Sequence, residues 1–393
     1  MIKKTIREFY LLSSVTSAGM GVISTSYVAF LLSKGLNLFE VNLINVFCYV
    51  TLFICEIPTG AFADIFGRKM SFVVSCICMM LSGIVYGLAD TFWGFAVSEI
   101  IFAFGATFAS GAFTAWYVDK LRHQGFEESF SPVFARCSFY KQMSNMIFSL
   151  VGGYAASMNM AAPWFISSII FIIAGCVALT YKEEYFVRKS FSWSEGLRQM
   201  KEVAKTSCQY GFRHSNIRFI LIVMIIQSLV LQGPNMQWQP FFEGHVPNAV
   251  WFGYIKVCIV ISLMLGALVA PRILRNIKDE RTAINMCQCA TGLGLMASVM
   301  FSWLPSMFVF FMIHEIARGS FRPIIDAYLH DSIEQKDRAT VESFQSLANH
   351  GGGIVGLLFS GFLGLHFGIS WSWGVCGGML VGSSLILIKR NKK

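Results

Sequence analysis

Long apolar segments recur along almost the whole chain, separated by short clusters of charged or turn-forming residues. Most of these segments are about twenty residues long, the length an α-helix needs to cross roughly 30 Å of hydrocarbon. The apolar runs and their interrupting residues predict twelve membrane-spanning helices. Their expected ranges are 9–32, 38–60, 70–89, 92–119, 134–157, 162–181, 217–242, 250–274, 282–302, 306–330, 340–365 and 370–388. The pattern therefore predicts an all-α membrane protein.

Composition supports a chain that folds in the lipid bilayer rather than in water. Hydrophobic residues make up 55% of the 393 positions and charged residues 13%, about half of the roughly 25% that soluble domains carry. The mean hydropathy is +0.59. Lys3, Lys4 and Arg7 precede a first apolar segment of full spanning length, so we expect this segment to persist as a helix rather than to be cleaved as a secretory peptide.

The basic residues predict the orientation, because cytoplasmic loops carry an excess of Lys and Arg. With both termini cytoplasmic, Lys34 is the one base expected outside, and Lys141, Lys256, Arg318 and Arg322 are those expected within spans, out of 31 in the chain. The net charge of +9 thus reflects topology, and no nucleic-acid partner is expected. The lack of any Asn-x-Ser/Thr site in the sequence fits a bacterial inner membrane.

The longest predicted cytoplasmic segment, 182–216, lies near the midpoint of the chain. It separates two predicted six-helix bundles, 1–181 and 217–393. Within it, Ser192 and Glu195 have the spacing of a helix capping box, and apolar residues follow at helical intervals beside basic ones. We expect an amphipathic helix that lies on the anionic inner leaflet. A solvated linker helix fits the same pattern.

The two predicted halves repeat a short pattern. Phe92 precedes Glu99 by seven residues in the fourth span, as Phe308 precedes Glu315 in the tenth. Further along the same spans, AWYVD ends at one acid and AYLHD at another. A repeated six-helix unit is typical of transporters that expose a central site to each side of the membrane in turn.

A short charged loop joins the second and third predicted spans and reads GAFADIFGRK at 60–69. The pattern Gly-x-x-x-Asp-x-x-Gly-Arg-Lys at this place in a twelve-span chain resembles the signature loop of the major facilitator superfamily. The span count, the central linker and the repeat extend the resemblance over essentially the whole chain. It implies the major facilitator fold, in which two pseudo-symmetric six-helix bundles rock about a central site.

The residue types of this loop suit a gate at the membrane surface. Gly67 gives the backbone freedom that a tight reversal needs, while Arg68 and Lys69 anchor the loop to the cytoplasmic side. Asp64 would be stabilised by the N-terminus of a neighbouring helix, and Asp119 is placed to pair with Arg68. The resemblance implies that such contacts hold the cytoplasmic face closed. The predicted gating motif is Gly60, Asp64, Gly67, Arg68, Lys69 and Asp119.

The resemblance also implies that the first, fourth, seventh and tenth spans line a central cavity. On the seventh, Gly233-Pro234 is expected to break the helix, which is tolerated only beside a water-filled cavity. Ser13 shares one face of the first span with other serines. Serines on membrane helices also bond to neighbouring helices, so a packing role stays open. The cavity candidates are Ser17, Ser24, Tyr27, Gln232, Asn235, Gln237, Trp238, Arg318, Lys256 and Lys141.

Ionisable side chains within spans are costly and are therefore candidates for function. Glu315 and Arg318 lie three residues apart on one predicted helix and are expected to neutralise each other. Glu99 has no such base on its helix, so it is the first candidate for carrying a proton, followed by Glu56 and Glu315. The two span lysines are expected either to pair with these acids or to meet an anionic substrate.

Glycines at a spacing of four predict close helix contacts in the last two spans. Gly374, Gly378 and Gly382 predict a packing face on the twelfth span, and Gly352 and Gly356 predict one on the eleventh.

These features predict a secondary active transporter of a small solute, driven by a proton or ion gradient and working as a monomer. No GxxxxGK[ST] loop is present in the sequence, so ATP is not expected to drive it. We expect no cofactor, no metal site and no enzymatic activity, since His314-Glu315-x-x-Arg318 lacks the second histidine of a zinc motif. Export is favoured slightly over the uptake of a nutrient or metal chelate. A receptor without transport, or a membrane-embedded transferase, is the less favoured alternative.

Overall fold

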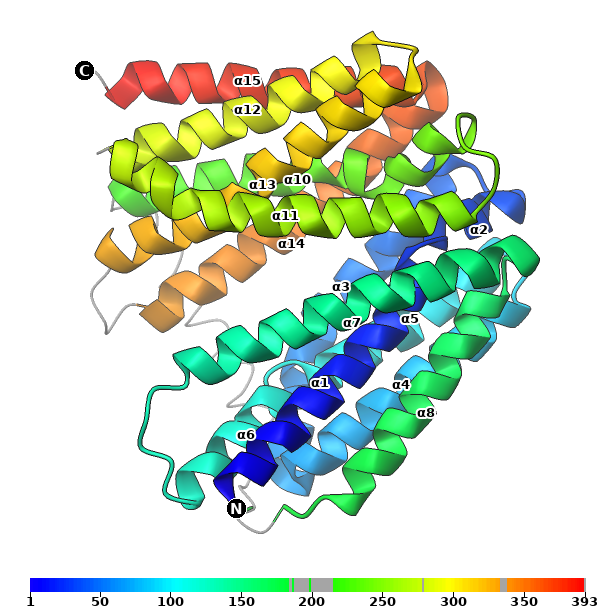
Figure 1. The fold of residues 1–393 in the computed structure, drawn as a ribbon, viewed down its shortest axis with the longest axis vertical. Helices are drawn as coiled ribbons and strands as arrows, with labels where there is room; N and C mark the ends of the chain where they lie inside the picture. The colour runs from blue at the N-terminus through cyan, green and yellow to red at the C-terminus, as the bar shows by residue number, and fades with distance from the viewer. Residues whose placement is uncertain (184–185, 187–197, 199–214, 278, 333–337, 392–393) are drawn as a thin grey trace. The chain divides into compact units, whose positions relative to one another are not determined.

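The computed structural model describes residues 1–183, 186, 198, 215–277, 279–332 and 338–391. Within these residues the chain forms α-helices and contains no β-strand (Figure 1). The helices are α1 (Ile2–Ser24), α2 (Tyr27–Ser33), α3 (Leu38–Phe66), α4 (Arg68–Leu88), α5 (Phe92–Ala109), α6 (Ala112–His123), α7 (Ser131–Met158), α8 (Ala162–Thr180), α10 (Ser215–Glu243), α11 (Val250–Asn276), α12 (Glu280–Met300), α13 (Leu304–Ser332), α14 (Arg338–Phe367) and α15 (Ile369–Asn391). The stretch of 182–216 in which an amphipathic helix is expected lies, apart from Arg198, outside the described residues.

Ten helical segments of the described chain are long and apolar enough to cross a membrane. Two of these segments each consist of two consecutive helices: α1 with α2, and α5 with α6. α7 and α13 have spanning length but are more polar, since α7 carries Arg136 and Lys141 and α13 carries Glu315 and Arg318. Together they make the predicted twelve spans in the described chain, and the protein is an integral membrane protein.

Two spans that were expected to be single helices are each interrupted. Between α5 and α6, Gly111 has a φ of +70°, a conformation that only glycine adopts without strain, so the helix is broken at that point. Between α1 and α2, Ser26 leaves helical geometry at φ −127°. The adjacent Thr25 hydroxyl lies 3.0 Å from the Ser149 carbonyl of α7, a side-chain contact that joins the break to a neighbouring helix.

The predicted break at Gly233-Pro234 is wrong. α10 runs without interruption from Ser215 to Glu243, with Pro234 and Pro240 inside it. A proline removes one backbone donor and crowds the preceding turn, but neighbouring helices and small local adjustments accommodate it in a membrane helix. A Cβ on Gly233 would meet the Cys376 sulfur of α15 at 3.4 Å, an ordinary van der Waals contact, so the packing of α15 does not require a glycine here.

The described chain divides into two compact units. Unit 1 comprises 1–36, 44–197 and 246–257, and unit 2 comprises 37–43, 198–245 and 258–393. The start of α3 therefore belongs to unit 2, where the Asn42 amide donates to the Leu357 carbonyl of α14 at 2.7 Å. The start of α11 belongs to unit 1, where Gly253 packs against the backbone of α7.

Corresponding helices pair in the two units, as expected from the repeated pattern in the sequence. In unit 1, α1 packs against α7 and α8, and α4 packs against α5 and α8. In unit 2, α10 packs against α14 and α15, and α12 packs against α13 and α15. The first span of each bundle thus contacts the fifth and sixth, and the third contacts the fourth and sixth. The two bundles are pseudo-symmetric in their internal packing.

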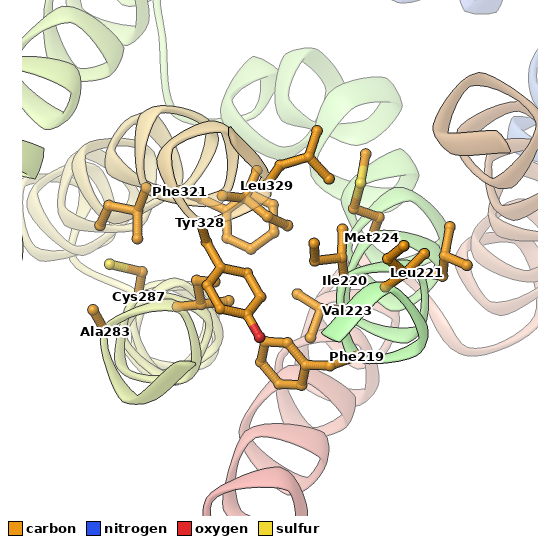
Figure 2. Packing of buried hydrophobic residues seen from close by; sticks show 14 of the residues in the cluster. Phe219, Ile220, Leu221, Val223, Met224, Ala283, Cys287, Phe321, Tyr328 and Leu329 are labelled. Carbon is orange, nitrogen blue, oxygen red and sulfur yellow. The ribbon is translucent and has the colours of Figure 1, made fainter. Parts of the chain in front are cut away.

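Each unit has an apolar core between its helices. In unit 2 the core joins α10, α12 and α13, with Ile220, Ile284 and Ile324 fully buried. Figure 2 shows Tyr328 directed toward Phe219 at one side of this cluster. The Arg281 guanidinium donates to the Tyr328 hydroxyl at 2.7 Å. In unit 1 the core is richer in aromatic rings.

The glycine predictions are confirmed for one helix and wrong for the other. A Cβ on Gly356 would lie 2.1 Å from the Leu229 carbonyl oxygen of α10, and one on Gly352 would lie 2.9 Å from another α10 carbonyl. The glycines predicted to form the packing face of α15 meet nothing within 4 Å. In that helix Gly377 makes the close contact, since a Cβ on it would lie 2.7 Å from the Gly292 carbonyl oxygen. Spacing alone does not tell which face of a helix meets a neighbour. The three glycines of α15 without such a contact are Gly374, Gly378 and Gly382.

We expect Gly356→Ala to destabilise unit 2, because the new methyl group would force α10 and α14 apart. Overpacking of this kind typically costs about 1–3 kcal/mol. Thermal unfolding of the purified protein in detergent measures the effect. The matched control is Gly374→Ala, which adds the same methyl group where there is space and replaces glycine by a better helix former. Equal melting temperatures for the two variants would contradict the assigned packing.

Candidate functional site

The GRK turn (Gly67, Arg68 and Lys69) joins α3 and α4 with a single residue between the two helices. α3 ends at Phe66 and α4 begins at Arg68. Gly67 has a φ of +97°, so the conformational freedom expected of this glycine is used. The chain reverses here over the shortest possible connection.

The predicted ion pair between Arg68 and Asp119 is present. The Arg68 guanidinium donates to the Asp119 carboxylate of α6. Asp119 is well exposed, with 61% of its side chain accessible, so the pair is screened by solvent and holds the helices weakly. Among the other predicted gating residues, Asp64 is half-buried and Gly60 is exposed. Their predicted roles stay predictions.

Glu183 completes the turn and was missed by the sequence analysis. Its carboxylate accepts hydrogen bonds from the backbone N–H groups of Arg68 at 2.9 Å and Lys69 at 3.2 Å. A carboxylate at this position satisfies unpaired donors at the N-terminus of α4 and is attracted by the helix dipole. A Cβ on Gly67 would lie 2.6 Å from a Glu183 oxygen. Gly67 is therefore needed for its backbone conformation, and it also leaves room for the Glu183 carboxylate.

Neighbouring contacts connect the same end of unit 1. The Lys69 ammonium donates to the Leu179 carbonyl at the end of α8, at 2.9 Å. Lys120, next to the paired Asp119, donates to the Glu8 carboxylate of α1 at 2.7 Å, and both side chains of this second pair are largely buried. The helices α1, α4, α6 and α8 are thus joined at one end by charged groups.

The Glu99 cluster (Glu99, Tyr86, Tyr27, Asn45 and Trp164) draws one residue from each of five helices of unit 1. Glu99 of α5 is 6% exposed and accepts a hydrogen bond from the Tyr86 hydroxyl of α4. The Tyr86 hydroxyl lies 3.3 Å from that of Tyr27 on α2. The Asn45 amide of α3 donates to the Tyr27 hydroxyl at 2.8 Å. The carboxylate is therefore joined to a chain of neutral polar groups.

Aromatic rings enclose this cluster. The Trp164 indole of α8 stacks on the Tyr86 ring, with centroids 4.0 Å apart and planes at 10°. The Tyr27 ring meets the same indole edge-on at 5.9 Å. Phe95 lies 5.7 Å from Tyr86. Within the described part of the chain, Glu99 forms no ion pair with a basic residue, so its carboxylate lies in apolar surroundings without a compensating positive charge.

Glu315 occupies the matching place in unit 2 and has the partner that the sequence predicted. Arg318 donates to both of its carboxylate oxygens, at 3.2 and 3.3 Å. The His314 Nε2 atom lies 3.9 Å from the same carboxylate, and its Nδ1 atom meets the Thr291 carbonyl at 2.9 Å. Glu315 is 2% exposed. Its charge is compensated from within its own helix.

The serines predicted to line the cavity bond to backbone groups. Ser17 donates to the Lys141 carbonyl of α7 at 2.9 Å, and Ser24 donates to Gly21 in its own helix at 3.2 Å. Ser13 is buried. These contacts match the helix-packing alternative, and a role in binding a ligand stays a prediction. The Lys141 side chain itself is exposed.

The polar residues of the seventh span are mostly buried between helices. Gln237 is 0% exposed and donates to the Ser360 carbonyl of α14 at 2.8 Å. Gln232 donates to the Ser228 carbonyl one turn earlier at 3.3 Å. Trp238 is buried and Asn235 half-buried. Because α10 is unbroken, most of these polar side chains contact their own helix or a neighbouring helix.

Two other sequence candidates, Glu56 and Lys256, belong to α3 and α11. Glu56 is exposed on α3, and Lys256 is half-buried on α11. The residues that the sequence analysis missed, Tyr86, Asn45 and Trp164, come from three different spans. No local spacing identifies them, because only the packing of the helices brings them to Glu99. Among the described residues, no three His, Cys, Asp or Glu side chains gather as a metal site would require.

Comparisons with known proteins agree with this architecture. The family model described as Major Facilitator Superfamily matches residues 278–393. An uncharacterized MFS-type transporter, YxaM of Bacillus subtilis (strain 168), is 21% identical over 97% of this chain and 93% of its own length. Multidrug resistance protein 2 of the same organism is 22% identical over 85% of this chain and 82% of its own length.

Solved structures share the fold at low sequence identity. The nucleoside transporter NupG superposes with a TM-score of 0.82 at 13% identity, covering 99% of both chains. A bacterial homologue of the iron transporter ferroportin, in an inward-facing state, gives a TM-score of 0.77 at 11% identity, again over 99% of both chains. With its twelve spans, its repeated helix pairing and its GRK turn, the chain has the major facilitator fold and is similar to transporters of that superfamily.

Proposed function

We propose that the protein is a secondary active transporter that moves a small solute by alternating access and is coupled to the proton gradient through Glu99. The similarity to MFS-type transporters over almost the whole chain, and to the family model over residues 278–393, supports secondary transport. The observation that carries the coupling is a buried carboxylate that no basic residue of the described chain neutralises. The driving force is then an ion gradient, and no cofactor takes part.

The chemistry of Glu99 suits a proton carrier. An ionised carboxylate in the membrane interior costs several kcal/mol unless it is paired. Glu99 has neutral neighbours, of which Tyr86 supplies one hydrogen bond, so the closed cluster favours a neutral carboxyl group. Contact with water on one side of the membrane would let the proton leave. The charge of Glu99 then determines whether its helices can close around it.

The other two acids suit this role less well. Glu315 is held by Arg318 at 3.2 Å, so a proton would have to displace an existing ion pair. Glu56 is exposed on α3, so it lacks the enclosed apolar surroundings of Glu99. Of the three carboxylates, Glu99 alone combines burial with the lack of a base in the described chain.

We assign the gating role to the GRK turn and its partners. The Arg68–Asp119 pair joins α4 to α6, and Glu183 joins the end of the α8 segment to the N-terminus of α4. Exposed ion pairs are individually weak, which suits contacts that must break and re-form in every transport cycle. The gate works at the cytoplasmic face, with both termini cytoplasmic in a bacterial inner membrane.

Export is favoured slightly over uptake. The similarity to multidrug resistance protein 2 over 85% of the chain supports export of an amphipathic molecule, and the aromatic shell of Glu99 suits such a solute. Uptake of a nutrient or metal chelate is the second candidate. The solved relatives, at 11–13% identity, support the fold and carry no argument about the solute. We propose that the monomer is the functional unit.

We expect Glu99→Gln to abolish solute movement driven by a pH gradient while leaving counterflow exchange intact. The amide cannot release a proton but preserves the shape of the side chain. The measurement uses the protein in liposomes with an imposed pH gradient and a panel of solutes that includes ethidium and nucleosides. Glu128→Gln makes the same change at an exposed carboxylate and should behave as the wild type. A Glu99→Gln protein that still concentrates a solute against its gradient would rule out coupling through this carboxylate.

We expect Asp119→Asn to slow the transport cycle several-fold without weakening solute binding, because it removes one contact of the gate and leaves the Glu99 cluster unchanged. Initial rates in liposomes and equilibrium binding in detergent separate the two effects. Asp90→Asn is the matched control, since it removes another exposed ion pair of unit 1, the pair with Lys34. If both variants slow the cycle equally, the effect is general to surface charge and the gate is assigned wrongly.

A further inference from the structure

We propose that the surface where α1 packs against α7 binds the phosphate group of an anionic membrane phospholipid. Four side chains form this site, the lipid seam: Arg7, Tyr10, Arg136 and Tyr140. It shares no residue with the Glu99 cluster or the GRK turn, and it does not depend on which solute is transported. The ligand is a phospholipid of the phosphatidylglycerol class, which carries a single negative charge beside its acyl chains.

The helices α1 and α7 pack side by side and run in the same direction. The Tyr10 and Tyr140 rings meet across the seam with their centroids 5.3 Å apart. Further along both helices, a Cβ on Gly21 would lie 2.7 Å from the Asn145 carbonyl oxygen. The two contacts follow the same order along both helices, so the residues that precede the tyrosine contact lie on the same side of it.

Each helix places an arginine one turn before the tyrosine contact. Arg7 precedes Tyr10 by three residues and Arg136 precedes Tyr140 by four, separations that put two side chains on one face of a helix. Both arginines are exposed, and the charge of Arg136 is close enough to act on the Tyr10 hydroxyl of the other helix. A guanidinium group donates in a fork that matches two phosphate oxygens. The seam thus gathers two phosphate-binding groups beside two tyrosine hydroxyls.

The arginines of the lipid seam differ from the neighbouring bases in having no partner within the described chain. At the same end of unit 1, Arg68 and Lys120 pair with carboxylates, and Arg122 donates to a backbone carbonyl at 3.1 Å. Arg7 and Arg136 form no ion pair with any described residue. Like charges repel each other, and an anion that binds both removes this repulsion.

The depth of the seam suits a lipid headgroup. Arg7 and Arg136 lie close to the predicted starts of their spans, at 9 and 134. Beyond Arg136, the same face of α7 is exposed at Tyr140, Met143 and Ile147, which follow at separations of three and four residues. From Arg136 to Ile147 the helix rises roughly 16 Å, about half of a 30 Å hydrocarbon core. An acyl chain can therefore lie along α7 while the phosphate stays at the arginines.

The surroundings select against other ligands. A cation is repelled by the two guanidinium groups, because Glu8, the acid beside Arg7 in the sequence, is paired with Lys120. Glu127 and Glu128 lie in the segment before α7 and form no ion pair within the described residues. A soluble anion gains only the screened attraction of exposed charges. A phospholipid gains the same attraction and also covers the apolar face of α7.

Native mass spectrometry of the purified full-length protein in detergent, titrated with dioleoylphosphatidylglycerol, tests this proposal. We expect the wild type to bind this lipid more tightly than dioleoylphosphatidylcholine, whose headgroup has no net charge. The double variant Arg7→Gln/Arg136→Gln should bind phosphatidylglycerol roughly twentyfold more weakly, since each base near a lipid surface contributes about fivefold. The matched control is Arg272→Gln/Arg275→Gln, which removes two exposed arginines of α11 from a stretch without aromatic residues and should bind as the wild type does.

Competition with soluble compounds separates a lipid site from a general anion site. Inorganic phosphate and glycerophosphoglycerol, the headgroup without its acyl chains, should fail to displace the lipid even in large excess. Displacement by either compound would overturn the proposal, as would equal weakening of binding in the two double variants. Both seam arginines are exposed, so the lipid-free variant should melt at the temperature of the wild type. Equal binding of the two phospholipids by the wild type would overturn the proposal without recourse to any variant.

Discussion

The hydrocarbon core of a membrane offers no hydrogen-bond partners, so each backbone group must find one inside the protein. This constraint explains why every membrane-spanning segment of the described chain is helical. It also governs the polar side chains, many of which donate to a carbonyl of a neighbouring helix. Thr25 reaches Ser149, Ser167 reaches Gly19 at 3.0 Å, and Gln237 reaches Ser360. Such contacts form only where helices approach closely.

The same lack of solvent makes every charge in the interior depend on its immediate neighbours. Glu8 and Glu315 each have a basic partner, Lys120 and Arg318, within 3.2 Å. Glu99 instead has hydroxyl groups and aromatic rings around it, which suit a neutral carboxyl group. The internal repeat makes this difference visible. Glu315 is neutralised by a basic residue of its own helix, whereas Glu99, at the corresponding position of the other half, has no such base.

The GRK turn shows how one short motif draws on residues far away in the chain. Gly67 allows the reversal between α3 and α4, but Glu183, more than one hundred residues later, supplies the carboxylate for the exposed N–H groups of α4. Lys69 contacts the end of α8, and Arg68 contacts α6. The end of the sixth span and the residues that follow it are therefore joined directly to the GRK turn. Weak, exposed contacts of this kind can be broken without loss of the fold.

The lengths of the hydrophobic segments were enough to predict most of the architecture from the sequence. An apolar run of about twenty residues can form few stable structures other than a membrane-spanning helix. The expected starts of α3 and α5, at 38 and 92, agree with the structure to the residue. Residue spacing within one helix was equally reliable for local contacts. The Glu315–Arg318 pair follows from a separation of three residues, whatever the rest of the chain does.

Contacts between helices were decided by the tertiary structure. The sequence singled out Glu99 as an acid without a local base, but Tyr86, Asn45 and Trp164 carry no signal in their own spans and meet it only after packing. Spacing likewise predicted a glycine face on α15 that meets nothing, while Gly377 makes the contact instead. The physical reason is that apolar periodicity reports the environment of a helix, lipid or protein, whereas the rotation and depth of each helix against its neighbours depend on the shapes of all the surfaces together.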